Sequence, residues 1–359
     1  MGKINALTGI RAFAAVWVIF FHCIGDGRSA LTNEWVNNFA NRGGSAVDLF
    51  YVLSGFIMAF VYGDKMTTLS WKTTRSFLWK RFARIYPAHF TVLMLFLAVF
   101  LFAVFTGSPY TKEFHTVPKF FYQLFMLNGL GIPDSNGWNF PSWTISSEFF
   151  AYLLFPVLTL WTGKLNRLQS VVAVVAIYLA MYGAAFMITG GTTYYLPHSL
   201  ILTRIGSQFT VGCLLYNIAS ADVLKKNAGW VSQLAFVLVI VVSTVATSDM
   251  SIGILSMLYS ILIVSLAEDR GSLLSKLMSS RVMVFFGDIS YSIYIIHNFT
   301  LIILNQAANR VPFLSNNLAH GTMVRFAADF ALAVVGGTVL HFGIEVPARR
   351  WLTSIGKKK

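Results

Sequence analysis

Stretches of about 20 apolar residues recur along this chain from Ile10 to Ile344, and they restrict its fold more than any other feature. A helix of this length crosses a bilayer with every backbone polar group hydrogen-bonded inside the protein. Only 11% of the residues are charged, against about a quarter in soluble domains. The chain is therefore predicted to be an all-α integral membrane protein with a single domain over residues 1–359, and a water-soluble fold is excluded.

Ten stretches qualify as membrane spans, and one further region is ambiguous. The ten are 9–26, 44–62, 88–106, 143–162, 168–190, 201–219, 229–247, 251–267, 283–306 and 322–344. Region 119–131 either crosses the membrane or forms a re-entrant, interfacial piece. An eleventh crossing there would move the basic residues of 164–167 and 225–226 outside. The positive-inside rule therefore favours ten crossings with both termini cytoplasmic, in the inner (plasma) membrane of the cell.

The formal net charge of +13 would suggest nucleic acid binding in a soluble protein. Because the basic residues lie between spans, topology explains the charge, and membrane lipids rather than nucleic acid are the expected partners. The longest basic stretch, 64–87, is predicted to be an amphipathic segment on the cytoplasmic surface that ends at Pro87. It serves either as a surface anchor or as a phosphate-binding site.

The two cysteines fall in predicted spans without metal-ligand neighbours, so no metal is expected.

The first span carries two ionisable side chains, and such groups inside a membrane mark functional-site hypotheses. Arg11 and His22 are eleven residues apart, about three helical turns and roughly 16 Å, so they share one helix face. A cation at one end and an imidazole at the other could bracket an elongated ligand such as coenzyme A. The structural alternatives are that Arg11 reaches the lipid headgroups and that His22 hydrogen-bonds to a neighbouring helix.

Further ionisable groups fall at a depth similar to that of His22. They are Asp48 in the second span, Glu148 in the fourth and His297 in the ninth. An acid beside an imidazole fixes its tautomer and raises its basicity, so either acid is expected to orient His22. Arg204 starts near the outer end of its span, where it could pair with these acids or touch an anionic acceptor.

The Ser54–Gly55 pair in the middle of the second span has two interpretations. Small residues permit close packing of helices, and they also permit a local break beside a bound ligand.

The sequence resembles the acyltransferase-3 family of membrane acyltransferases over nearly its whole length. Five segments in the expected order carry the resemblance. They are RAFAAVWVIFFH, in which a basic residue and ten others precede histidine, AVDLFYVLSGF, the Arg-x-x-Arg of RFAR, WTISSEFF, and ISYSIYIIHNF. The run Ser45-Ala46-Val47 before Asp48 is a mild departure, because Gly-Val-Asp is common there in the family.

The resemblance implies an O-acyltransferase without a fused esterase-like domain. Such an enzyme would move an acyl group, most often acetyl from cytoplasmic acetyl-CoA, to a hydroxyl of an extracytoplasmic or lipid-linked glycan such as an exopolysaccharide. The residues expected to hold the coenzyme are Arg11, Arg81, Arg84, Ser54 and Gly55. The expected catalytic set is His22, Glu148, Asp48 and His297. The residues expected to contact the acceptor are Trp143, Ser147, Tyr291, Tyr294 and Arg204.

Two alternatives stay open. A proton-coupled transporter or flippase of a glycan or small molecule uses the same intramembrane His, Glu and Arg, although no interrupted spans related by an internal repeat are found here. Within the enzyme hypothesis, His22 acts either as a general base or as a covalent acyl carrier. The sequence does not specify the acceptor, the acyl group or the oligomeric state.

Overall fold

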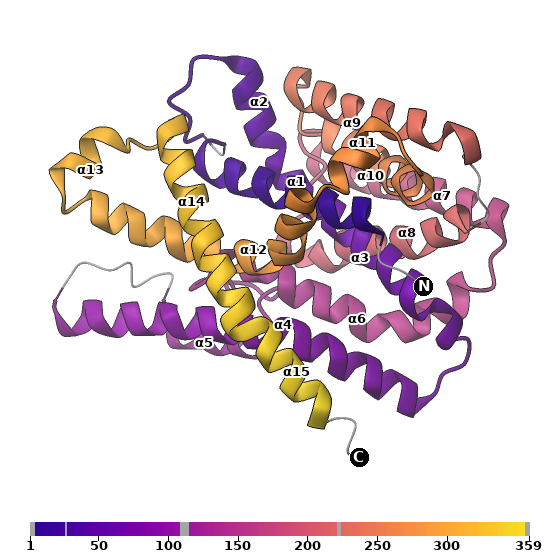
Figure 1. Cartoon of the computed structure of the whole chain (residues 1–359), viewed down its shortest axis with the longest axis horizontal. Helices are drawn as coiled ribbons and strands as arrows, with labels where there is room; N and C mark the ends of the chain where they lie inside the picture. Colours follow the sequence, from indigo (N-terminus) through magenta and orange to yellow (C-terminus); the bar gives the residue numbers. More distant parts are fainter. Residues whose placement is uncertain (1–3, 26, 108–114, 221–223, 356–359) are drawn as a thin grey trace.

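The computed structural model describes residues 4–25, 27–107, 115–220 and 224–355, and this part of the chain contains helices but no β-strand. Each predicted span lies on a long helix (Figure 1): α1 (Asn5–Cys23), α3 (Ala46–Tyr62), α4 (Trp71–Phe105), α6 (Trp143–Thr162), α7 (Arg167–Thr189), α8 (Ile201–Ala219), α9 (Ala228–Val245), α10 (Ser251–Glu268), α12 (Arg281–Ala308) and α14 (Met323–Leu340). Lys3, Lys112 and Lys357 to Lys359, which entered the topology prediction, lie outside the described residues.

The shorter elements connect these helices. They are α2 (Glu34–Arg42), α5 (Val117–Leu124), α11 (Leu273–Met278), α13 (Pro312–Asn317) and α15 (Val346–Ile355), with single turns η1 (Gly43–Ser45), η2 (Gly63–Lys65), η3 (Phe140–Ser142), η4 (His198–Leu200) and η5 (Lys225–Asn227). A π-helical turn, η6 (His341–Glu345), joins α14 to α15.

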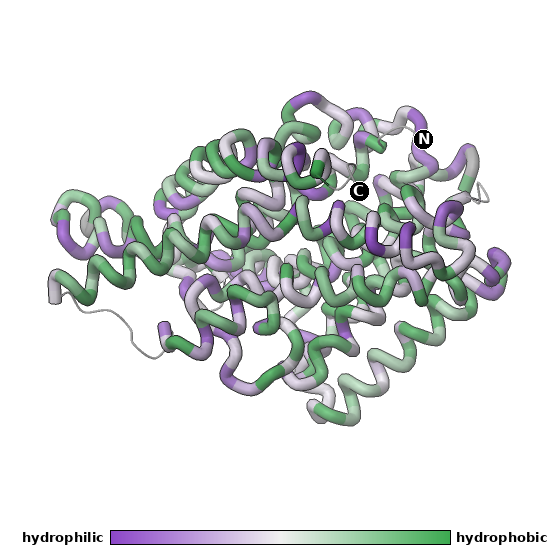
Figure 2. The backbone as a smooth tube through the Cα atoms, turned by 90° about the horizontal axis from the view of Figure 1, so that it is seen from below, coloured by the Kyte–Doolittle hydropathy of each residue, from purple (hydrophilic) through white to green (hydrophobic). Residues whose placement is uncertain are grey.

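Nine of the described helical segments are long and apolar enough to cross a membrane. The tenth long helix, α8, falls short because Arg204, Gln208 and Asn217 interrupt its apolar sequence. Large apolar side chains on the long helices point outward, for example Phe105 and Met187, which are 91% and 86% exposed. In Figure 2, hydrophobic residues run the length of the long helices. An exterior of this kind belongs in lipid, which confirms an all-α, multi-pass integral membrane protein.

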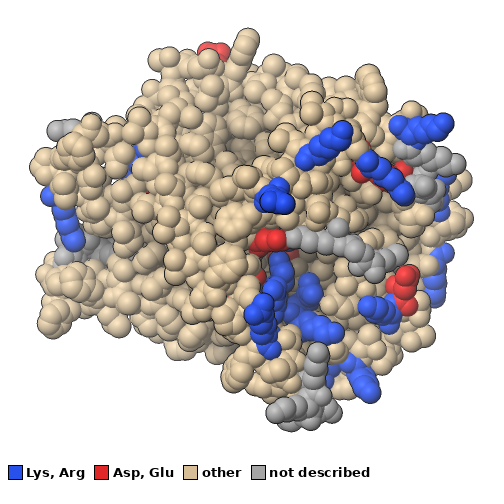
Figure 3. All heavy atoms as spheres, in the orientation of Figure 1, with Lys and Arg blue, Asp and Glu red and all other residues tan. Residues whose placement is uncertain are grey.

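Helices α1 and α12 lie side by side at the centre of the bundle, with α14 packed on α12, α3 on α8 and α9 on α10 (Figure 1). The beginning of α1 and the end of α15 lie toward one side of the molecule, and α5 and α13 lie toward the other. On the face drawn in Figure 3, most Lys and Arg gather on the side of the two chain ends. This distribution agrees with the positive-inside argument, while the assignment of that side to the cytoplasm stays a prediction.

Helix α4 departs from the predicted boundary at Pro87. The expected break is absent, and one helix of 35 residues continues from the basic segment into the third span. The missing N–H of Pro87 leaves the carbonyl of Ala83 without its helical donor, which membrane helices tolerate where the surrounding protein supports them. The Tyr291 hydroxyl donates to the carbonyl of Ile85 at 2.5 Å and ties this part of α4 to α12. Arg81 and Arg84 are therefore fixed on the same rigid rod as the membrane span.

Region 119–131 does not cross the membrane. Its helix, α5, has eight residues and is about 12 Å long, against the roughly 30 Å of a bilayer core. The chain then folds back to the start of α6, held by buried amides. Gln123 accepts from the backbone N–H of Asn139 at 3.1 Å, and the Asn139 amide donates to the carbonyl of Ile295 at 2.8 Å. This is the re-entrant form of the prediction, with its irregular backbone satisfied inside the protein.

Two glycines set the close approach of α3 and α8. A Cβ on Gly55 would lie 2.0 Å from the carbonyl oxygen of Phe209, and one on Gly212 would lie 2.0 Å from that of Val52. Gly55 therefore faces α8, and its expected place beside the coenzyme is wrong. The packing interpretation applies to Gly55, whereas its neighbour Ser54 faces a cavity.

Gly55→Ala is expected to destabilise the protein by about 1–3 kcal/mol, because the new methyl group overlaps a backbone oxygen that cannot turn away. The measurement is the midpoint of thermal unfolding in detergent. Gly183→Ala is the matched control, since a Cβ at that helical position meets nothing within 4 Å and alanine is the better helix former. Equal unfolding midpoints for the two variants would contradict the packing role of Gly55.

Candidate functional site

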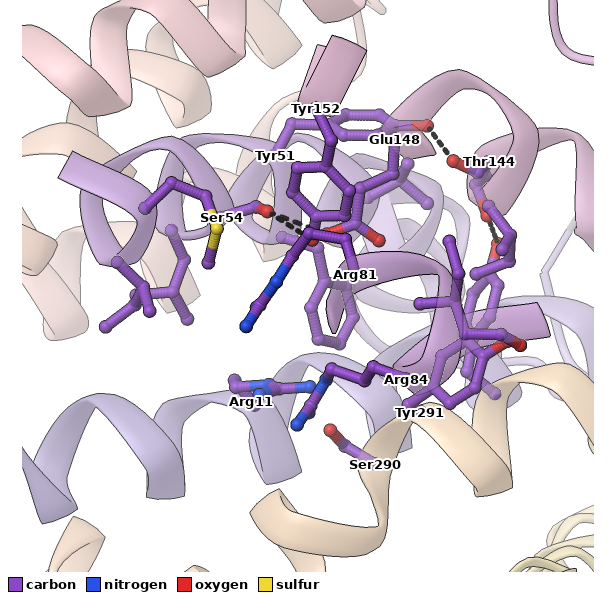
Figure 4. Close-up of a pocket in the computed structure, with 18 residues that line it drawn as sticks. Arg11, Tyr51, Ser54, Arg81, Arg84, Thr144, Glu148, Tyr152, Ser290 and Tyr291 are labelled. Carbon is purple, nitrogen blue, oxygen red and sulfur yellow. Dashed lines mark hydrogen bonds between the residues drawn. The ribbon is translucent and has the colours of Figure 1, made fainter. Parts of the chain in front are cut away.

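A first cavity of about 180 Å³, here called the arginine cavity, lies between α1, α3, α4, α6 and α12. Figure 4 shows the guanidinium groups of Arg11, Arg81 and Arg84 pointing into the same space. Ser54, Glu148, Tyr152, Tyr291 and Tyr294 also line it. The spacing of Arg81 and Arg84 on one rigid helix, opposite Arg11 of α1, brings three permanent positive charges to one cavity.

The carboxylate of Glu148 is held by hydroxyl groups in this cavity. Ser54 donates to it at 2.7 Å, and Tyr152, one helical turn along α6, donates to it at 2.5 Å (Figure 4). Among the described residues, none of the three cavity arginines forms an ion pair with a carboxylate. The arginines that do are Arg42, Arg204, Arg325 and Arg349. The Nε of Arg81 is buried without a hydrogen-bond partner among the described residues. Three arginines against one carboxylate leave the cavity with surplus positive charge, which suits an anionic ligand.

A second cavity of about 680 Å³, here called the histidine cavity, contains His22. Its walls come from α1, α3, α6, α8 and α12 and from two connecting segments, 131–136 and 195–199. Trp143 and Arg204 line it, as does Tyr195, whose ring lies 4.2 Å under the Arg204 guanidinium. Burial raises the pKa of Tyr195, so its phenol remains a neutral hydrogen-bonding group.

The two cavities meet at a common wall. Val47 and Tyr294 line both of them. The Tyr294 hydroxyl accepts a hydrogen bond from Thr144 at 3.0 Å and donates one to the carbonyl of Pro141 at 3.3 Å, which fixes the ring in the wall. Arg11 and His22, on one face of α1, thus lie on opposite sides of this wall and point into the bundle rather than into lipid.

His22 packs against His297, with ring centroids 5.1 Å apart. The Nδ1 of His297 hydrogen-bonds to the carbonyl of Tyr294, and because a carbonyl can only accept, Nδ1 carries the proton. In the neutral imidazole, the Nε2 of His297 is then the unprotonated nitrogen. It is buried without a partner among the described residues, which makes it an available acceptor beside His22.

The two acids expected beside His22 are placed elsewhere, and that expectation is wrong. Asp48 is completely buried, and both of its oxygens bind Arg204, at 2.9 and 2.8 Å. A buried carboxylate is stable only with such a partner, so Arg204 binds it in place of the imidazole. Glu148 lies in the arginine cavity. Of the predicted catalytic set, only His297 is brought to His22.

Ser147 does not line either cavity. Its hydroxyl donates to the carbonyl of Gly129, at 2.7 Å, and to that of Trp143. Its neighbour Glu148, about 100° further around the helix, lines the arginine cavity instead. Ser147 fastens the re-entrant segment to α6, and its predicted contact with the acceptor is wrong.

Several cavity residues carried no signal strong enough to be selected from the sequence. Tyr152 follows Glu148 by four residues, a spacing that places side chains together on a helix and could have identified it. Tyr195 and Asn136 lie in loops and His198 begins the single turn η4, where no periodicity predicts which side chains face inward.

The chain is similar to known acyltransferases over nearly its whole length. Residues 4–342 match the acyltransferase domain that defines the acyltransferase-3 family. Acyltransferase MdmB of Streptomyces mycarofaciens is 26% identical, over 98% of this chain and 92% of the relative. Peptidoglycan O-acetyltransferase OatA of Listeria monocytogenes is 25% identical over 82% of this chain, which spans about half (49%) of that relative. No solved structure gives a significant match.

Proposed function

The chain belongs to the acyltransferase-3 family and is a membrane acyltransferase, and from this premise we propose an O-acyltransferase that joins the two cavities in one reaction. Acyl-CoA, acetyl-CoA in the first instance, binds in the arginine cavity. The acyl group passes to a hydroxyl of an extracytoplasmic or lipid-linked glycan in the histidine cavity. The observation that carries this proposal is the shared wall of Val47 and Tyr294, with Arg11 and His22 on either side.

The arginine cavity supplies what a coenzyme A thioester requires at its nucleotide end. Arg11, Arg81 and Arg84 are permanently charged, and their planar forks match phosphate oxygens. Because none of them pairs with a carboxylate in the described structure, no ion pair must be broken before phosphate binds. The long acyl-bearing arm would then extend from Arg11 along α1 toward His22, a rise of roughly 16 Å.

The chemistry follows from the imidazole pair. The acceptor oxygen attacks the thioester carbonyl, the carbon–oxygen bond forms, and the carbon–sulfur bond breaks. His22 takes the proton of the acceptor hydroxyl and returns it to the departing thiolate, so that ester and free coenzyme A result. His297, whose ring packs against that of His22, holds it in position. The Tyr294 hydroxyl in the shared wall would stabilise the oxyanion after releasing its hydrogen bond to the Pro141 carbonyl. An acyl-histidine on His22 is the other route to the same products.

The test compares acetyl-CoA with acetyl-pantetheine, which has the same thioester and no nucleotide phosphates. We expect Arg84→Gln to raise the KM for acetyl-CoA by about 10–100-fold, because one charge-assisted hydrogen-bond donor is lost. The KM for acetyl-pantetheine should stay unchanged. The measurement is release of free thiol by purified protein in nanodiscs.

Arg75→Gln is the control, since Arg75 is an exposed arginine on the same helix that does not line the cavity. An equal loss with both donors would remove Arg84 from phosphate binding. Absence of any thiol release or acyl transfer by the unaltered protein with both donors would overturn the proposed function itself.

A further inference from the structure

We infer that the histidine cavity selects an uncharged acceptor, a neutral glycoside with one apolar face, and discriminates against anionic sugars such as uronates. This inference rests on the proposed function, because it identifies the substrate class of that site. Three observations carry it: the size of the cavity, its aromatic wall, and the pairing of every fully charged side chain among its described lining residues.

The size and wall of the cavity suit a ring compound. At about 680 Å³ it lies in the range of pockets that enclose small organic ligands. Phe21, Phe140, Trp143 and Tyr195 present aromatic surface, and Asn136 and Ser199 present hydrogen-bonding groups. Aromatic faces pack against the C–H face of a sugar or another saturated ring, while amides and hydroxyls bind its hydroxyl groups.

The charges in the lining are already neutralised. Arg204 forms a bidentate pair with Asp48, and both side chains are buried. Asp134 pairs with Lys119 at 2.6 Å. Arg204 was a predicted contact for an anionic acceptor, but its charge is taken by Asp48 and its face is covered by Tyr195. A carboxylate entering this cavity would lose part of its water without gaining an unpaired arginine or lysine, which is costly.

The arginine cavity shows the opposite arrangement. Its three arginines have no carboxylate bound to them, as an anionic donor requires, whereas the one arginine of the histidine cavity is tied to an acid. Two cavities that meet at one wall therefore differ in net charge. This difference would keep donor and acceptor from binding in each other's place.

The experiment measures direct binding of two matched probes, p-nitrophenyl β-D-glucoside and p-nitrophenyl β-D-glucuronide, by saturation-transfer NMR on the full chain in nanodiscs. Sugar-headed detergents are avoided because they would compete for the site. We expect the glucoside to bind at least about 10-fold more tightly than the glucuronide. Equal binding, tighter binding of the glucuronide, or binding of neither probe would overturn the inference. Because binding needs no turnover, the result is separate from the thiol-release test of the proposed function.

Two variants, each with a matched control, test whether the histidine cavity sets the preference for the glucoside. Trp143→Ala should weaken glucoside binding about 10-fold, whereas Trp230→Ala, at a tryptophan that is 71% exposed on α9, should not. Ser199→Lys adds an unpaired cation to the lining and should bring glucuronide binding to the level of the glucoside. Ser220→Lys, at the opposite end of α8, adds the same charge outside the cavity and should leave the preference unchanged. If Ser199→Lys and Ser220→Lys behave alike, charge in the lining does not set the preference.

Discussion

His22→Ala is expected to lower acyl transfer by about 10³-fold or more while acyl-CoA still binds, because the variant loses the imidazole that takes the proton of the acceptor hydroxyl in the proposed reaction. General-base catalysis accounts for about 10²–10⁴-fold in rate, and loss of the base exposes this whole factor. The measurement is a single turnover with labelled acetyl-CoA already bound. Donor affinity should stay within about 2-fold, since His22 lies outside the arginine cavity.

The control for this variant is His320→Ala. His320 lies in the connection between α13 and α14 and lines neither cavity, so its loss should leave the single-turnover rate unchanged. Retention of full transfer by His22→Ala would remove His22 from the mechanism under both routes. A stable labelled protein in the unaltered chain, cleaved by hydroxylamine and absent from His22→Ala, would select the acyl-histidine route over the general-base route.

The membrane-spanning helices were predictable because their signal is local. Each needs about 20 apolar residues in a row, and this pattern can be recognised without knowing which helices pack beside it. The orientation of Arg11 and His22 was predictable for a similar reason. Their separation of eleven residues places both on one face of a single helix, whatever that helix contacts. Both predictions depended on a single element, and the structure agrees with them.

Predictions that joined two elements were less secure. Asp48, Glu148 and His22 lie at similar positions along their helices, but depth does not determine which side chains face one another across the bundle. Asp48 faces α8, where Arg204 neutralises it, and Glu148 faces the arginines. The boundary at Pro87 was a local prediction, and the helix continues through the proline. For Asp48 and Glu148, partners on other helices decide where each carboxylate lies.

The Asp48–Arg204 pair gives the second large prediction, on stability. Arg204→Met is expected to destabilise the protein by about 3–5 kcal/mol, because it leaves a completely buried carboxylate without its cation. The measurement is the midpoint of thermal unfolding in a detergent without a sugar headgroup. Removing both charges in Arg204→Met with Asp48→Leu should restore most of the loss, since a buried pair replaced by apolar side chains is often neutral in stability.

Asp249→Asn provides the comparison with a pair whose carboxylate is partly exposed. Asp249 binds Arg42 at 2.5 Å, and its side chain is 48% exposed. The buried Arg42 keeps its bonds to Ser251 and to the carbonyl of Ala246, and the asparagine oxygen can still accept from it, so the cost should be about 1 kcal/mol or less. Similar losses of stability for Arg204→Met and Asp249→Asn would show that burial does not increase the contribution of the Asp48–Arg204 pair. A double variant no more stable than Arg204→Met would mean that the guanidinium matters through its packing on Tyr195 rather than through its charge. The packing of Arg204 on Tyr195 would then maintain the wall of the histidine cavity. The neutralised charge of that wall would be a consequence of this packing.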